Sequence, residues 1–177
     1  MTYKKYTKGF EFCWIEDFPF FKLDSHSGKL DFNHNPFSKL HTNDWGDHLS
    51  QDELLKIKAY QFDIVCNGYE LGSGALRNHS ADMLYKLFEM VGYDQAYVDQ
   101  KFNALLTGLK FGAPPHGGIA LGVDRIIMLL SGKSSIREVV AFPVNQNGID
   151  HLMKAPNTLD NDFLMDLGIV VNNDDKK

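Results

Sequence analysis

The first half of the chain reads as strands separated by turns. Residues 10–15, FEFCWI, alternate in the two-residue period of a strand, and Pro19 ends or bends that strand because proline cannot donate to a ladder. Two further strand-like runs cover residues 62–67 and 70–76. Asn67-Gly68 joins them and suits a tight turn with positive φ. The pattern therefore predicts a β-hairpin.

Between these strands the pattern is weaker. Residues 24–31 are rich in turn formers, and residues 33–47 are dense in His, Asn, Pro and Gly, which predicts a turn followed by a long loop. Residues 49–60 could form a short helix.

From Ser80 onward the apolar period becomes helical. The first stripe has the spacing i, i+3, i+4, i+7 and consists of Leu84, Leu87, Phe88 and Val91. Ser80 is placed to cap the start of this helix and Gly92 to end it. A second helix is expected from about 94 to 109, with Asp94 near its cap. Its expected stripe is Val98, Phe102, Leu105 and Leu109.

A short apolar strand at 119–121 then leads directly into a third helix that Gly132 can end. Its expected inward residues are Val123, Ile126, Ile127 and Leu130. Strands precede helices instead of alternating regularly with them, so the fold class expected is α+β with an antiparallel sheet, not a doubly wound parallel sheet.

Composition sets the class of protein. The 177 residues are 44% hydrophobic, which fits one globular unit. Their formal charge of −5 argues against a domain that binds nucleic acid by itself through neutralising phosphates. Cys13 and Cys66 lie in apolar runs and are expected to be buried free thiols. The longest wholly apolar run, 126–130, is far short of the roughly 20 residues of a membrane span, and no secretory signal fits the N-terminus, so a cytoplasmic location is expected.

Candidate chemistry lies first in residues 117–125, GGIALGVDR. Glycines around a strand that opens into a helix let a ligand approach the backbone, and the helix N-terminus offers free N–H groups to an anion. Arg125 in the first helical turn suits stacking on a base or contact with phosphate. The same residues also fit simple turns beside a solvated arginine.

The hairpin carries the second candidate. In a regular strand Glu70, Gly72 and Gly74 share one face and Arg77 lies opposite, unless a bulge at the glycines shifts the register. The glycines could clear space for a ligand beside the Glu70 carboxylate, which could hold Mg²⁺ that bridges phosphates. A glycine-weakened strand with Glu70 in solvent is the alternative. His34, in a polar turn, could be a ligand contact or a local hydrogen bonder.

Together these segments resemble the carboxy-terminal part of the catalytic domain of a class II aminoacyl-tRNA synthetase, specifically a bacterial-type aspartyl-tRNA synthetase. Residues 112–125, GAPPHGGIALGVDR, resemble motif 3, and residues 141–143, AFP, follow at the expected place. Residues 67–79 resemble the substrate hairpin of that family, and residues 14–37 resemble the segment that leads to it. The resemblance covers residues 10–170, which leaves 1–9 as a lead-in or linker remnant and 171–177 as a polar tail.

The resemblance implies a role for each matching residue. His34 and Arg77 would bind L-aspartate, with Arg77 on the side-chain carboxylate. Glu70 would bind ATP through Mg²⁺. The remaining ATP contacts would be Gly122, Val123, Asp124 and Arg125. The implied reaction is ATP-dependent formation of aspartyl-adenylate followed by transfer to tRNA, and it relies on positioning and charge stabilisation more than on a protein nucleophile.

Departures from the family pattern qualify this picture. The family often has two successive histidines where this chain has His34-Asn35, and three glycines where it has Gly72-Ser73-Gly74. Nothing in the chain resembles motif 1, which forms the dimer interface, or motif 2, whose arginine holds the α-phosphate. The anticodon-binding barrel and the bacterial insertion domain have no counterpart either. The chain is therefore expected to be a fragment of a homodimeric synthetase, inactive alone, with an open sheet edge where motif 2 would pair.

Three other identities are considered. Arg77 argues against a lysyl-tRNA synthetase because it would repel a cationic substrate side chain. Asn78-His79 after it resembles the aspartyl more than the asparaginyl enzyme, which stays an alternative. A non-catalytic nucleotide-binding or regulatory module is the alternative from another class, and the joint presence of His34, Glu70, Arg77 and Arg125 argues against it.

Overall fold

A computed structural model describes residues 9–172, so the predictions for residues 1–8 and 173–177 lie outside the described residues. The described chain divides into two units, 9–126 and 127–172, each of which is described by itself. None of the helices within residues 9–172 has the length and apolar character that crossing a bilayer requires.

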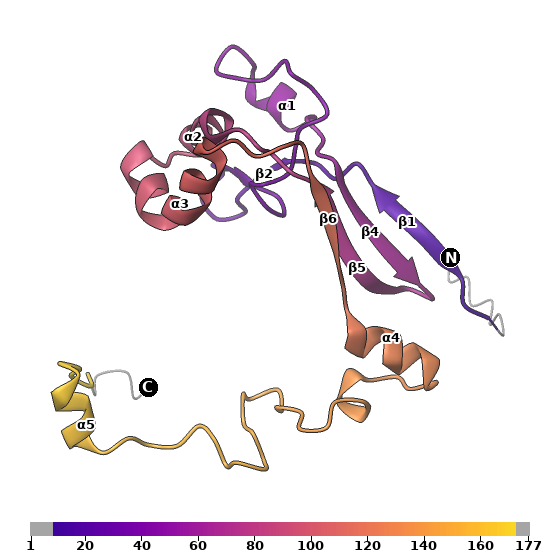
Figure 1. The fold of residues 1–177 in the computed structure, drawn as a ribbon, viewed down its shortest axis with the longest axis vertical. Coiled ribbons are helices and arrows are strands. Elements are labelled where there is room, and N and C mark those ends of the chain that lie inside the picture. The colour runs from indigo at the N-terminus through magenta and orange to yellow at the C-terminus, as the bar shows by residue number, and fades with distance from the viewer. Residues whose placement is uncertain (1–8, 173–177) are drawn as a thin grey trace. The chain divides into compact units, whose positions relative to one another are not determined.

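The first unit is built on a four-stranded antiparallel sheet (Figure 1). Its strands, in spatial order, are β1 (Phe12–Glu16), β4 (Gln61–Cys66), β5 (Tyr69–Leu76) and β6 (Gly117–Leu121). The predicted hairpin is confirmed as β4 and β5, because Asn67 and Gly68 both adopt positive φ, of 50° and 86°. The strand expected at 119–121 is also confirmed, as part of β6.

A second, two-stranded sheet flanks the turn predicted at residues 24–31, and the sequence analysis did not predict its strands. It pairs β2 (Phe21–Leu23) with β3 (Leu30–Phe32). Asp24 closes the turn between them, since its Oδ1 accepts hydrogen bonds from the main-chain N–H groups of His26 and Ser27 and from Ser27 Oγ. These strands have three residues each, which is too short for a period-two pattern to stand out in the sequence.

Two helices follow the sheet strands as predicted. Helix α2 (Ala81–Met90) begins after Ser80, whose Oγ accepts from Met83 N, and helix α3 (Gln95–Lys110) begins after Asp94, whose carboxylate accepts from Tyr97 N.

The expected apolar stripe of α3 is only partly correct. Phe102 has non-helical φ and ψ of −123° and 23°, which marks a kink. Beyond it Leu106 is buried, whereas Leu105 is 41% exposed. The kink changes the rotational phase that an unbroken helix would give, so the sequence spacing places the wrong leucine inward.

The helix expected at residues 49–60 is much shorter than that range. Helix α1 (Gln51–Leu54) has four residues. Ser50 and Glu53 form a reciprocal capping box at its start. Lys58 and Ala59 instead form antiparallel bridges with Pro19 and Leu40, because the chain there returns to an extended conformation alongside the segment that follows β1.

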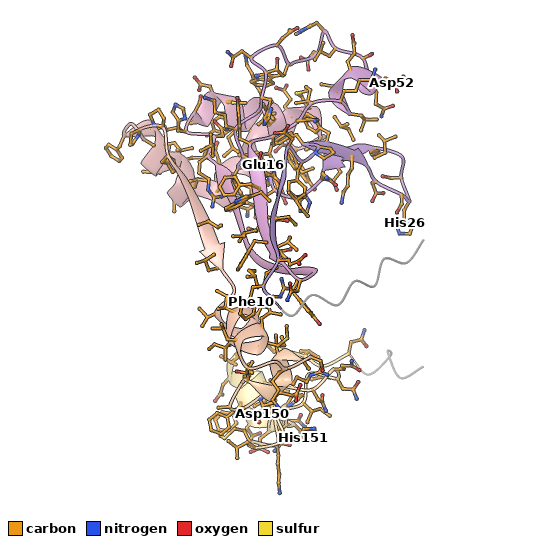
Figure 2. The ribbon with its side chains drawn as sticks, turned by 90° about the vertical axis from the view of Figure 1, so that its right-hand side faces the viewer. Phe10, Glu16, His26, Asp52, Asp150 and His151 are labelled. Carbon is orange, nitrogen blue, oxygen red and sulfur yellow. The ribbon has the colours of Figure 1, made fainter. Side chains whose placement is uncertain are left out.

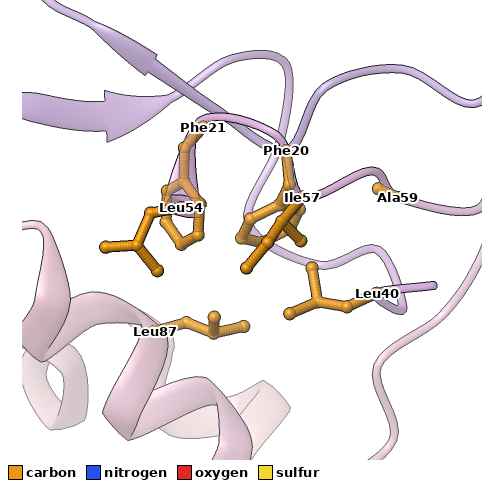
Figure 3. Packing of buried hydrophobic residues seen from close by; sticks show 7 residues of the cluster. All are labelled: Phe20, Phe21, Leu40, Leu54, Ile57, Ala59 and Leu87. Carbon is orange, nitrogen blue, oxygen red and sulfur yellow. The ribbon is translucent and has the colours of Figure 1, made fainter. Parts of the chain in front are cut away.

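The core of the first unit lies where α2 meets the loops and β2. One cluster of buried apolar residues consists of Phe20, Phe21, Leu40, Leu54, Ile57, Ala59 and Leu87 (Figure 3). A second cluster joins α2 to α3 and consists of Leu84, Phe88, Val98 and Leu106. Between the same helices, Tyr85 Oη donates a hydrogen bond to Asp99. These contacts fix the end of β5 that enters α2.

Helix α4 (Val123–Leu130) spans the boundary of the two units. Its predicted inward face is wrong. Val123 and Leu130 are 62% and 68% exposed, while Met128 is buried. The apolar spacing predicts the helix, but it does not predict which face of the helix is buried against the rest of the described chain.

The second unit contains a short 3-10 helix, Ile136–Glu138, and helix α5 (Asn161–Asp166). Between them lie Asp150 and His151, which Figure 2 labels. Asp150 accepts from the N–H groups of Leu152 and Met153, and His151 pairs with Asn145.

The two cysteines of the first unit are free thiols. Cys66 is buried as expected, but Cys13 on β1 is exposed.

Candidate functional site

A bulge in β5 brings Glu70 and Arg77 to the same face of the sheet. Glu70 pairs with Val65 and Gly72 pairs with Ile64, so Leu71 has no partner on β4. Arg77 is seven positions beyond Glu70, and strict alternation would put the two side chains on opposite faces. The extra residue at the bulge shifts the alternation by one, so both side chains lie on the same face. The sequence analysis allowed for such a bulge.

The two faces of the sheet differ in character, as the registers of all four strands show. The Glu70 face carries mostly small and polar residues, together with the apolar Ile15 and Val65: Cys13, Gln61, Asp63, Glu70, Ser73, Ala75 and Ala120. The other face carries large apolar residues: Phe12, Trp14, Phe62, Ile64, Ile119 and Leu121. Short polar side chains, which a polar ligand requires, gather on the Glu70 face, where Glu70 and Ser73 are exposed.

Gly72 and Gly74 do not clear space beside Glu70, contrary to the sequence interpretation. A Cβ added at Gly74 would lie 2.5 Å from both the Phe62 ring and the Gly118 carbonyl oxygen. A Cβ at Gly72 would lie 2.7 Å from the Leu121 side chain. These glycines therefore allow neighbouring strands and rings to approach the apolar face, on the side away from Glu70.

Arg125 and Glu70 are in direct contact. Arg125 Nη1 lies 3.4 Å from Glu70 Oε1 and donates a hydrogen bond of 2.6 Å to the Glu70 main-chain oxygen. Both side chains are about half exposed, with fractions of 46% and 49%. The start of α4 is fixed beside them because Gly122 N donates to the carbonyl of the bulged Leu71 at 2.7 Å. Val123 and Asp124 follow it at the exposed start of α4.

Asp63 is a residue that the sequence analysis missed. It lies on β4 opposite Ser73, whose Oγ donates to Asp63 Oδ1 at 2.6 Å, and it shares the Glu70 face. Diagonal neighbours on adjacent strands are about 7–8 Å apart, close enough for two carboxylates to face one bound group. Alternation along β4 could have found it, since Asp63 and Val65 occupy the same face.

Arg77 is held at the far end of β5 by backbone contacts on both sides. Its N–H donates to His116 O at 2.8 Å, and it forms an antiparallel bridge with Ser38. Its side chain is half-buried. These contacts fix the backbone of Arg77 between β6 and the loop that contains His34.

His34 lies in that loop and is exposed. Its ring packs edge-to-face against the ring of Phe18, with the two ring centroids 4.8 Å apart. The next residue, Asn35, closes the turn because its Oδ1 accepts from Phe37 N and Ser38 Oγ, both at 3.0 Å. The loop thus connects His34 to the Ser38–Arg77 bridge. Asn35, at the position of the second histidine of the family pattern, has a local structural role here.

The carboxylates present on the Glu70 face fit a magnesium ion that also binds phosphate. Mg²⁺ usually takes one or two protein carboxylates and keeps its other positions for water and phosphate oxygens. Glu70 and Asp63 supply that number, and residues 9–172 contain no group of three or more His, Cys, Asp or Glu side chains arranged for a metal held by protein alone. Arg125 beside Glu70 supplies a positive charge for phosphate or base.

Comparison with known proteins decides the family. The model of class II tRNA synthetases of the D, K and N type matches residues 1–146. The chain belongs to this family. It is 51% identical over 166 residues to the aspartate–tRNA(Asp/Asn) ligase of Rickettsia africae and 49% identical over 172 residues to that of Rickettsia prowazekii. These matches cover 92% and 95% of the chain but 27% and 28% of the relatives, so the chain spans about a quarter of their length.

Solved structures agree on the fold of this synthetase chain. Aspartyl-tRNA synthetase from Entamoeba histolytica has a TM-score of 0.53 at 24% identity and covers 78% of the chain, which is 23% of that protein. Asparaginyl-tRNA synthetase from Pyrococcus horikoshii has the same TM-score at 19% identity over 76% of the chain and 26% of its own. The α+β class with an antiparallel sheet is thereby confirmed.

Proposed function

We propose that the chain is the carboxy-terminal part of a cytoplasmic aspartate–tRNA ligase and carries half of its amino-acid activation site. The observation that carries this proposal is the common face of Glu70 and Arg77, which the bulge at Leu71 creates, with Arg125 in contact with Glu70. It brings a carboxylate and two arginines to one surface, which supports the roles proposed for them. The Rickettsia relatives, 51% and 49% identical, bear the name of this activity.

In this proposal the residues divide between two substrates. Arg77 binds the side-chain carboxylate of L-aspartate in a bidentate pair, and His34 closes the pocket from the loop. Gly122, Val123, Asp124 and Arg125 line the ATP site, where Arg125 faces the adenine and the terminal phosphate. Glu70 holds Mg²⁺ together with Asp63, and the ion when bound neutralises phosphate charge.

The reaction is attack of the aspartate α-carboxylate on the α-phosphorus of ATP. A carboxylate–phosphorus bond forms, pyrophosphate leaves, and aspartyl-adenylate results. The aspartyl group is then transferred to the terminal ribose of tRNA, with release of AMP. This chain contributes orientation and charge compensation to both steps, and none of the residues named acts as a nucleophile.

The rest of the ligase supplies what this chain does not. The motif 2 arginine for the α-phosphate, most of the tRNA contact and the homodimer interface belong to regions with no counterpart here. The isolated chain is therefore inactive in ATP–pyrophosphate exchange. Exchange by the 177-residue chain at the rate of an intact synthetase would contradict this part of the proposal.

A chimaera tests the function itself. Residues 10–170 of this chain replace the matching quarter of the Rickettsia africae ligase, and aspartate-dependent ATP–pyrophosphate exchange is measured. Exchange is expected in the chimaera and loss of at least a hundredfold with Arg77→Ala, because one member of a charged pair is removed. Arg137→Ala, an exposed arginine of the second unit, is the matched control and retains activity. A folded chimaera without exchange, or one indifferent to Arg77→Ala, overturns the proposal.

A further inference from the structure

Asn78 carries a buried amide donor with no partner among the described residues. The residue is 8% exposed, and its Nδ2 makes no hydrogen bond. Its Oδ1 is occupied, because it accepts from Ser80 N at 3.0 Å beside the start of α2. A buried donor left unpaired costs free energy, so an acceptor that reaches Nδ2 is required to satisfy it.

Asn78 is one of the residues that line a cavity shared with Arg77. The cavity has a volume of about 270 Å³, close to the small end of ligand pockets. Its polar lining is Arg77, Asn78 and His116, and its apolar wall includes Phe37, Leu84 and Leu105. Asn78 is therefore next to the proposed aspartate clamp in space as well as in sequence.

The chemistry of the lining favours an anion. Arg77 offers several N–H donors and no acceptor, and Asn78 adds Nδ2. His116 uses Nδ1 to donate to the Pro114 carbonyl at 2.8 Å, so Nε2 adds a further donor only in the protonated ring. Among the described residues that line this cavity none is acidic. Donors together with a guanidinium and no competing carboxylate fit a substrate carboxylate.

Backbone hydrogen bonds fix the positions of both donors. Asn78 N donates to Phe37 O and Arg77 N donates to His116 O, each at 2.8 Å. The peptide between Arg77 and Asn78 is thus held from the His34 loop and from the start of β6. A site fixed in this way loses little conformational freedom when ligand arrives.

We infer that Asn78 donates its Nδ2–H to the side-chain carboxylate that Arg77 binds and helps select aspartate over asparagine. The inference rests on the proposed function. A carboxylate accepts from both residues, whereas the –NH2 of an asparagine side chain would face donors and leave at least one of them unpaired. Asn78 is on this account a substrate contact and a specificity-determining residue.

The test separates the donor of Asn78 from its oxygen, which accepts from Ser80 N. Asn78→Asp keeps an oxygen for Ser80 N and replaces the donor by an anionic oxygen. The ¹⁵N-labelled 177-residue chain is titrated with a non-hydrolysable aspartyl-adenylate analogue, and the side-chain NH2 signal of Asn78 is assigned by its loss in the variant. The wild-type signal is expected to shift saturably, and Asn78→Asp is expected to bind at least about tenfold more weakly.

Gln61 provides the matched control. It is 5% exposed and also has a buried amide nitrogen without a partner, but it is not part of this cavity. Its NH2 signal should stay in place when the analogue binds, and Arg137→Ala, an exposed arginine of the second unit, should bind the analogue as the wild type does. An asparaginyl-adenylate analogue should bind the wild type more weakly than the aspartyl analogue does. In Asn78→Asp the difference in affinity between the two analogues should be smaller.

The outcomes distinguish this inference from the proposed function. If Arg77→Ala weakens binding while the Asn78 signal does not move and folded Asn78→Asp binds normally, the inference is wrong and the proposed function stands. If Arg77→Ala leaves binding unchanged, or the folded wild-type chain binds no analogue, both are wrong. If a variant fails to fold, the shift of the Asn78 NH2 signal in the wild-type chain still decides whether Asn78 contacts the ligand.

Discussion

Arg125 of helix α4 reaches back to strand β5 and contacts Glu70 twice, through the carboxylate at 3.4 Å and the main-chain oxygen at 2.6 Å. The two residues are 55 positions apart, so the contact depends on the pairing of β5 with β6. In the proposed site Arg125 and Glu70 serve the same nucleotide, one through phosphate and base and the other through the metal ion.

Arg125→Ala is predicted to impair nucleotide binding without unfolding the chain. Exposed ion pairs contribute about 0–1 kcal/mol, so the free energy of unfolding should change by no more than this. The affinity for ATP with Mg²⁺, measured by calorimetry on the chain, should fall at least about tenfold because a charged contact is lost. Arg137→Ala is the control. Unchanged ATP affinity in Arg125→Ala would remove this residue from the site.

Gly74→Ala is predicted to destabilise the sheet. The added Cβ would lie 2.5 Å from the Phe62 ring and from the Gly118 carbonyl oxygen, and overpacking of this kind costs about 1–3 kcal/mol. Gly118→Ala is the matched control, because no heavy atom lies within 4 Å of its added Cβ. Urea denaturation measures both variants, and equal midpoints would show that β5 and β6 are not packed as described.

Leu87→Ala is predicted to cost about 2–5 kcal/mol in the free energy of unfolding. Leu87 is fully buried and joins α2 to the cluster in Figure 3. Leu23→Ala on β2, where the side chain is 42% exposed, should cost less than about 1 kcal/mol. Equal losses of stability in the two variants, measured by thermal or urea unfolding, would argue against this core.

The capping box of α1 should respond to acid. Hydrogen bonds from the Ser50 side chain and backbone lower the pKa of Glu53 below its usual value. The carboxylate therefore adds stability above its unfolded pKa of about 4.3, and this contribution is lost as the pH falls through the lower folded value. Hydrogen exchange at Leu54 should lose protection in that window. Glu53→Gln should show less protection at neutral pH and little further loss; an identical pH profile in both proteins would contradict the role of Glu53.

Local signals in the sequence predict most of this fold. Asn67-Gly68 sets the hairpin, and Ser80 and Asp94 set the starts of α2 and α3, because turns and caps depend on a few adjacent residues. The motif around Arg125 was likewise readable, since a strand, a glycine and a helix start occur in one short run.

What the sequence did not predict depends on pairing between distant segments. The bulge at Leu71 is defined by its partners on β4, so the common face of Glu70 and Arg77 could not be derived from β5 alone. The role proposed for Asn78 depends on a cavity that residues of α2, α3 and the His34 loop line with it. The kink at Phe102 and the exposed stripe of α4 also have no local sequence signal.

The most direct test of the central claim, that this chain holds half of an aspartate-activation site, is calorimetric titration of the wild-type chain and Arg77→Ala with the aspartyl-adenylate analogue, and of the wild type with its asparaginyl counterpart. The account predicts saturable binding by the wild type, weaker binding of the asparaginyl analogue and loss of binding in Arg77→Ala. Equal affinity of the wild type and Arg77→Ala, or no binding by a folded wild-type chain, would contradict it.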